Sequence, residues 1–278
     1  MRSRKNKKSF VNYLPIYGCF STGIIYVAIG VIAILSFLKI KHGGADEISL
    51  VVFLNSFVIG KVFIWIILLG TISYISWRIY ESIRDPYGYG KKAKGLAMRI
   101  CIALSIIPDA LITYSVILIL LGKGSIREDG QPEEQRRMVS NIFGKSWGDW
   151  FIIVIGTLVC VTAIVQLIYG VTRGYRERLD VDHFSSGKKR LIHSLASAGY
   201  SARAIILGII GFFFIKAGSL KNSQFVVNTD KAFDFIGDHV GHIYFILVAI
   251  GTVCYGLFMF ALGATYDADK SANEVYAD

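Results

Sequence analysis

The residue with the clearest potential for chemistry is Asp109, which lies near the middle of a long apolar stretch. A charged side chain at the centre of a membrane costs roughly 2.5–3.5 kcal/mol, so this carboxyl group must be neutral, paired or in contact with water. Pro108 precedes it and lacks a backbone N–H, so it is expected to kink the helix and free a carbonyl that could coordinate an ion or solute. Two hypotheses follow: Asp109 binds a proton or cation, or it is protonated and bonded to Tyr114 or Gln166, which would hold helices together.

Two arginines, Arg78 and Arg203, are expected near the ends of membrane-spanning helices. Long cationic side chains at such places extend to the phosphate groups of lipids, which would explain both residues. Arg78 also lies three residues before Glu81 on the same helical face, so these two could form an ion pair instead.

Asp234, Asp238 and His242 are four residues apart and would form one stripe on a helix. They are weak candidates for a metal site, because the other repeats described below lack them, and a solvated helix face is the simpler explanation. The four cysteines stand in apolar segments at unrelated spacings and predict neither a disulfide framework nor a zinc site. No nucleotide-binding loop, nucleophile elbow or His-Glu-x-x-His helix is present, so an enzyme of the soluble type is not expected and no cofactor is identified.

Long apolar runs must position these residues. The chain of 278 residues is 54% hydrophobic and 18% charged, with the charges clustered between the runs. About 20 apolar residues suffice for a helix to cross the hydrocarbon of a membrane, where helices satisfy their own backbone hydrogen bonds. The sequence therefore predicts an all-α bundle of six transmembrane helices, at Tyr17 to Leu38, Gly60 to Ser82, Leu96 to Leu121, Trp147 to Thr172, Gly199 to Ala217 and Val240 to Thr265.

The distribution of basic residues predicts the orientation in the membrane. Lys and Arg are enriched in the arm Met1 to Lys8, around Lys91 and between Arg173 and Arg190, so both termini are expected in the cytoplasm. The first apolar run is longer than that of a cleavable signal peptide and is expected to remain as a span. The net charge of +10 is explained by attraction to anionic lipid headgroups and requires no nucleic acid.

The chain contains internal repeats. A shift of 181 residues superposes the first helix pair on the third without a gap, so that Gly18 meets Gly199 and Gly70 meets Gly251. In the middle pair, Gly156 is taken to occupy the place of Gly70 and Gly251. The predicted organisation is a basic arm (1–12), three parallel two-helix repeats (13–88, 95–178 and 190–267) about a pseudo-threefold axis, and a tail (268–278). Small residues let helices approach closely, and we expect this role for Gly23, Gly30, Gly70, Gly156, Gly208, Gly211 and Gly251.

At these residues the chain resembles the bacterial membrane family catalogued as domain of unknown function 1206. The family's first helix opens with Gly-Tyr-x-x-Arg-Gly, which is similar to the stretch from Gly199 to Ala204 with alanine in the last place. The first repeat departs from it with Thr22 in place of the arginine. The second helix of the family resembles the stretch that contains Gly70, Tyr74, Trp77, Arg78, Asp85 and Pro86. The resemblance implies a two-helix unit present three times and the bacterial inner membrane, and it implies no catalytic residues.

Three classes of function remain open from the sequence. The first is an accessory or structural membrane protein that binds lipids, other membrane proteins or further copies of itself, since glycine faces and short loops need no other explanation. The second is a small ion- or proton-coupled transporter or channel that uses Asp109. The third is a membrane-embedded enzyme acting on a lipid or a quinone.

Overall fold

The computed structural model describes the chain in a series of stretches, which are 14–38, 44–45, 47–55, 57–85, 90, 92–104, 106, 110, 113–114, 116–117, 120–121, 132–179 and 184–265. The described residues form helices and connecting turns and no β-strand, which confirms the all-α prediction. Among the described residues, five helices are long and apolar enough to cross a membrane: α1 (Leu14–Phe37), α3 (Val58–Arg84), α7 (Gly148–Val171), α8 (Ser186–Leu220) and α10 (His242–Ala264). Of the predicted third span, Leu96 to Leu121, only the beginning is described as a continuous helix, α4 (Ala93–Leu104).

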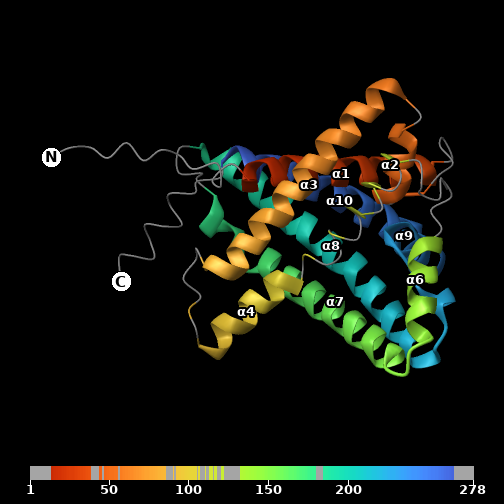
Figure 1. Ribbon diagram of the computed structural model, residues 1–278. Helices are drawn as coiled ribbons and strands as arrows, with labels where there is room; N and C mark the ends of the chain where they lie inside the picture. Colours follow the sequence, from red (N-terminus) through yellow and green to blue (C-terminus); the bar gives the residue numbers. More distant parts are fainter. Residues whose placement is uncertain are drawn as a thin grey trace.

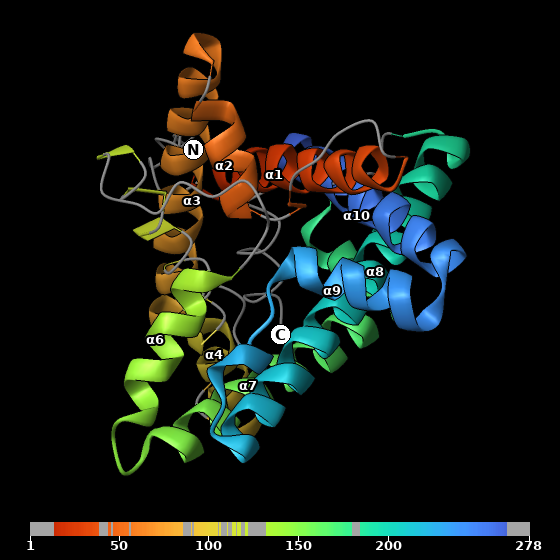
Figure 2. The same ribbon diagram turned by 90° about the vertical axis from the view of Figure 1, so that its right-hand side faces the viewer.

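A short helix precedes the second long helix of each repeat, and the two-helix prediction did not include it. These short helices are α2 (Glu47–Asn55), α6 (Glu133–Phe143) and α9 (Thr229–Phe235). They lie together at the right-hand end of the bundle in Figure 1, and Figure 2 views the protein from that end. Two 3-10 turns, η2 (Gly174–Arg178) and η3 (Ser223–Phe225), and a π-helical turn, η4 (Ile236–Val240), complete the described elements.

Small residues set the spacing within the first and third hairpins. A Cβ atom added to Gly70 of α3 would overlap Ser21 of α1, and one added to Gly251 of α10 would overlap Ala202 of α8. Since both members of each pair are related by the same shift of 181 residues, the two hairpins are packed in the same way. Ser21 adds a hydrogen bond, donating from Oγ to the Ile67 carbonyl at 2.9 Å.

Other glycines pack one repeat against the next. Gly30 of α1 lies against Ala249 of α10, whose carbonyl oxygen would be 2.9 Å from an added Cβ. Gly211 of α8 lies in the same manner against α7, where the Gly156 carbonyl oxygen would be 2.8 Å from an added Cβ. The first helix of the third repeat therefore packs on the second helix of the middle repeat, as α1 packs on α10.

These contacts correct the alignment of the middle repeat. Gly60 and Gly148 each abut the last turn of a short helix, Gly60 at the Leu54 carbonyl and Gly148 at the Ile142 carbonyl. Gly148 is 88 residues after Gly60 and 93 before Gly241, and these two shifts together give 181. In this register Gly156 corresponds to Ala249 and not to Gly251, so its placement beside Gly70 and Gly251 was wrong by two residues.

Candidate functional site

Asp109 and Pro108 lie outside the described residues. Gln166, the third candidate of this group, is on α7, and its Oε1 atom is buried without a hydrogen-bond partner among the described residues. Gln166 corresponds in the repeat register to Arg78 of α3.

Arg203 lies where α1, α8 and α10 meet. Its guanidinium carbon is 4.8 Å from the centre of the Tyr26 ring and 4.9 Å from that of Tyr255. One guanidinium nitrogen donates a hydrogen bond of 2.5 Å to the Tyr255 hydroxyl. Contacts between a cation and an aromatic face are strengthened when water is excluded, so this arrangement stabilises the arginine within the bundle. Arg203 of α8 thus contacts two other helices, α1 and α10. Its extension to a lipid phosphate stays a prediction.

Arg78 lies in a similar environment at the end of α3. Its Nε donates to the Tyr74 hydroxyl at 3.1 Å, and its Nη1 is 3.1 Å from the Glu81 carboxylate. The Glu81 side chain is fully buried, so the ion pair expected from the spacing of Arg78 and Glu81 is formed within the protein.

The two arginines therefore donate hydrogen bonds to equivalent tyrosines, but from different helices. Tyr74 and Tyr255 are related by the 181-residue shift, yet Tyr74 accepts from Arg78 on its own helix and Tyr255 accepts from Arg203 on the facing helix. We call these four residues, together with Glu81, the Arg–Tyr cluster. Its charged groups are held by hydrogen bonds and ring faces, which is what a polar group between membrane helices requires.

An aromatic cluster that the sequence analysis missed adjoins this site. Tyr175 in η2 is fully buried and contacts rings from three helices, with centroid separations of 6.3 Å to Tyr169, 6.1 Å to Tyr200 and 5.2 Å to Phe258. Burial raises the pKa of Tyr175, an effect that the nearby Arg173 and Arg176 partly oppose. The linker between the second and third repeats is thus anchored in the core. In the sequence, Tyr175 stands between Arg173 and Arg176, and this basic context gave no indication that its side chain is buried.

The stripe expected from Asp234, Asp238 and His242 is interrupted. α9 ends at Phe235, η4 follows, and Gly241 has a φ of 123°, a conformation that favours glycine and breaks the helix before α10. Asp234 is 2.7 Å from the ammonium group of Lys231, and His242 stacks edge-on at 5.5 Å from Phe37. Within the described stretches, no group of three or more metal-ligating side chains is found.

Asp230 connects the first repeat to the third at the end that carries the short helices. Its carboxylate accepts a hydrogen bond of 2.6 Å from the Ala45 N–H and lies 3.6 Å from the Lys231 ammonium group. Burial opposes the charge of Lys231, but the hydrogen bond to Asp234 and the charges of both aspartates outweigh it and raise the Lys231 pKa. The sequence analysis did not identify this connection, because Ala45 and Asp230 are far apart in the chain.

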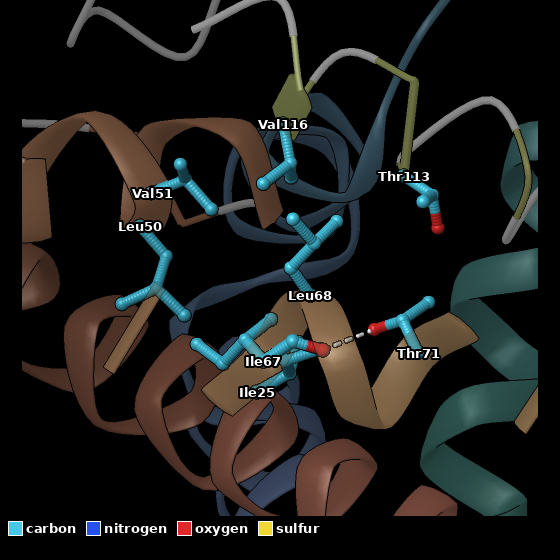
Figure 3. A pocket seen from close by; sticks show the side chains of 8 residues that line it. All are labelled: Ile25, Leu50, Val51, Ile67, Leu68, Thr71, Thr113 and Val116. Atoms are coloured by element: carbon cyan, nitrogen blue, oxygen red, sulfur yellow. Dashed lines mark hydrogen bonds between the residues drawn. The ribbon is translucent and has the colours of Figure 1, made fainter. Parts of the chain in front are cut away.

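A small pocket lies between α1, α2, α3 and the described part of the third predicted span (Figure 3). It has room for little more than a water molecule. Its polar groups are Thr71, whose hydroxyl already donates to the Ile67 carbonyl at 2.8 Å, and Thr113. Neither the size nor the lining of this pocket fits a substrate site.

The long apolar helices, the glycine contacts between them and the Arg–Tyr cluster indicate the class: the described residues form a helical bundle with internal repeats, and its long helices are apolar enough to cross a membrane. The family model DUF1206, described as Domain of Unknown Function, matches residues 17–85 and again residues 198–266. The resemblance seen in the sequence is thereby confirmed, and the chain carries the family's unit twice. The middle repeat is not part of this match.

A curated relative matches along almost the whole chain. It is the "Uncharacterized protein YxxB" of Bacillus subtilis (strain 168), with 24% identity over 263 residues, which cover 94% of this chain and 93% of the relative. No solved structure matches.

Proposed function

We propose that the protein is a structural or accessory component of the bacterial plasma membrane that binds lipids or other membrane proteins. In this proposal six helices cross the membrane as three repeats about a pseudo-threefold axis, and both termini are cytoplasmic. The observation that carries the proposal is the close packing of the long helices. At the glycine contacts, such as Gly211 against Gly156, the backbones of two helices lie in direct contact. Such close packing favours a rigid helical bundle.

Contacts of the third predicted span support six spans in a ring. Arg99 donates from Nε to the Ser82 carbonyl at 2.7 Å, near one end of α3. Val116 packs with Ile64 and Leu68, nearer the other end of α3. A third span along α3 would repeat the arrangement of α8 along α7 and of α1 along α10, so that every first helix packs on the second helix of another repeat.

The outward faces of α3 and α7 support binding to lipids or to a membrane partner. On α3, Ile59 and Leu69 are 73% and 60% exposed, and on α7, Trp150 and Ile164 are 71% and 58% exposed. Continuous apolar surface of this extent is stable only in contact with hydrocarbon or with another apolar surface.

Site-specific photocrosslinking in living cells tests this proposal. A benzophenone amino acid is placed at Ile164 of α7 or Leu69 of α3, and a matched control is placed at Ile250 of α10, which is 47% exposed. An accessory role predicts crosslinks to one or a few identified membrane proteins, or to lipid, from a subset of these faces. Identical, nonspecific patterns from all three positions would contradict a defined partner, and only lipid adducts would restrict the role to lipid binding.

A small proton- or cation-coupled transporter that uses Asp109 is the second candidate. The buried Oε1 of Gln166 supports it, because a carbonyl oxygen without a partner among the described residues can accept from a protonated carboxyl group or coordinate a cation. Reconstituted liposomes that contain a pH-sensitive dye test the idea. Proton flux that disappears in the Asp109→Asn variant would favour transport over a structural role.

A further inference from the structure

The first turns of α8 extend well beyond its apolar part. The helix has 35 residues and is therefore about 52 Å long, whereas the hydrocarbon core is about 30 Å thick. The predicted span begins at Gly199, so the preceding turns stand at the membrane surface or just above it. Lys188 and Arg190 on these turns are exposed to solvent.

The linker before α8 adds two more cations to the same surface. Arg173 and Arg176 flank the buried Tyr175, and both are exposed. The Arg176 guanidinium lies 3.4 Å from the imidazole of His193, which places the linker directly against α8. We call Arg173, Arg176, Lys188 and Arg190 the basic surface. Within the described ranges, no ion pair involves any of these four side chains.

The opposite end of the bundle differs in its charges. There Lys221 pairs with Asp149 at 2.6 Å, and Lys231 pairs with Asp234 at 2.7 Å. Lys221 and Lys231 at that end thus have acidic partners within the protein. The basic surface instead has a large apolar neighbour, Leu191, which is 60% exposed one turn from Lys188. Cations beside an exposed leucine fit the boundary between headgroups and hydrocarbon better than they fit a nucleic acid or an acidic protein.

We propose that the basic surface binds the phosphate-containing headgroups of anionic phospholipids in the membrane that holds the protein. This inference rests on the proposed lipid-binding role and names the lipid class and the site. Basic residues beside a membrane helix gain attraction from an anionic surface, at about 1 kcal/mol each, which corresponds to roughly a fivefold change in affinity. The attraction falls off over a Debye length, so it should weaken in salt.

Lipid titration of the full-length protein in zwitterionic micelles tests the proposal. The probes are dansyl-labelled phosphatidylglycerol and phosphatidylcholine with the same acyl chains. The wild-type protein is expected to prefer phosphatidylglycerol at low salt. In the double variant Lys188→Gln/Arg190→Gln this preference should fall by up to about 25-fold, from two charges at fivefold each.

A matched variant at the opposite end, Arg137→Gln/Lys145→Gln, removes the same net charge from exposed side chains. It should keep the preference within about twofold of the wild-type value, since each distant charge is screened. Equal losses in the two variants, or no preference in the wild-type protein, would overturn the proposal. Displacement of the lipid by glycerol phosphate, or tighter binding of RNA or of an acidic peptide, would also overturn it. Each of these results would leave the crosslinks from α3 and α7, and with them the accessory role, intact.

Discussion

Two glycines on α8, three residues apart, allow a sharp test of the packing argument. A Cβ atom at Gly211 would stand 2.6 Å from the Cys160 sulfur, 2.8 Å from the Cys160 nitrogen and 2.8 Å from the Gly156 oxygen. A Cβ atom at Gly208 would meet only Ala163, at 4.0 Å, so the close packing expected at Gly208 is not found. The same substitution by alanine therefore forces two helices apart at one position and fills open space at the other.

The two substitutions are expected to change the free energy of unfolding differently: Gly211→Ala should lower it, and Gly208→Ala should leave it unchanged or raise it slightly. Overpacking of a close contact typically costs 1–3 kcal/mol, and here two of the three clashing atoms belong to the backbone of α7, which cannot rotate away. Alanine in a helix is favoured over glycine by roughly 0.5–1 kcal/mol, so Gly208→Ala should be neutral or slightly stabilising. The two variants are expected to differ by about 1–4 kcal/mol.

The measurement is reversible unfolding of each purified variant in mixed micelles, followed by circular dichroism as denaturant is added. Gly208→Ala serves as the control for the loss of a glycine from α8. Equal stability of the two variants would refute the assignment of Gly211 to the α7–α8 contact and, with it, the corrected register of the middle repeat.

Three further predictions follow from the polar contacts. Tyr255→Phe removes the hydroxyl that accepts from Arg203 and should lower the free energy of unfolding by about 1.5–3 kcal/mol. The control Tyr244→Phe, at an exposed position, should have little effect. Equal losses in the two variants would contradict the Arg–Tyr cluster. The raised pKa of Lys231 means that its stabilising contribution is complete below the ordinary lysine pKa of about 10.4 and is lost as the pH rises through the higher folded-state value. Thermal unfolding between about pH 9 and about pH 12 should therefore decline more steeply for the wild-type protein than for Lys231→Met, and parallel curves would refute this. Asp109→Asn keeps the size of the side chain and removes its charge, so it should retain the wild-type melting temperature if this residue only bonds to a neighbouring helix, and a loss of proton flux in liposomes would favour the transporter instead.

The long helices were predictable because their cause is local. Apolar runs of sufficient length have few alternatives to a membrane helix, and the predicted Gly60 to Ser82 differs from α3 (Val58–Arg84) by two residues at each end. The helix α8 begins at Ser186, 13 residues before the predicted membrane span at Gly199. Hydropathy marks the membrane boundary, whereas this helix continues past that boundary through polar residues.

The alignment of the middle repeat shows why a motif alone was insufficient. Gly156 is followed by threonine, as Gly70 and Gly251 are, so an alignment based on the Gly-Thr dipeptide places these three glycines together. The contacts of Gly156 with α8 place it on another face of its helix, since two residues correspond to 200° of helical rotation. A glycine's function depends on the backbone that it faces, and one sequence does not reveal that neighbour.

For this protein, the sequence by itself determined the helical class, the apolar helices long enough for a membrane and the resemblance to the family, because hydrophobic length and repeated motifs are properties of contiguous residues. Tertiary structure decided what the polar residues do. Arg203 meets Tyr26 and Tyr255 from two other helices, Asp230 reaches Ala45 in another repeat, and the metal stripe is broken by η4 and Gly241. Each of these outcomes depends on which helices pack together, and this is set by shape and close contact between segments that are distant in the chain.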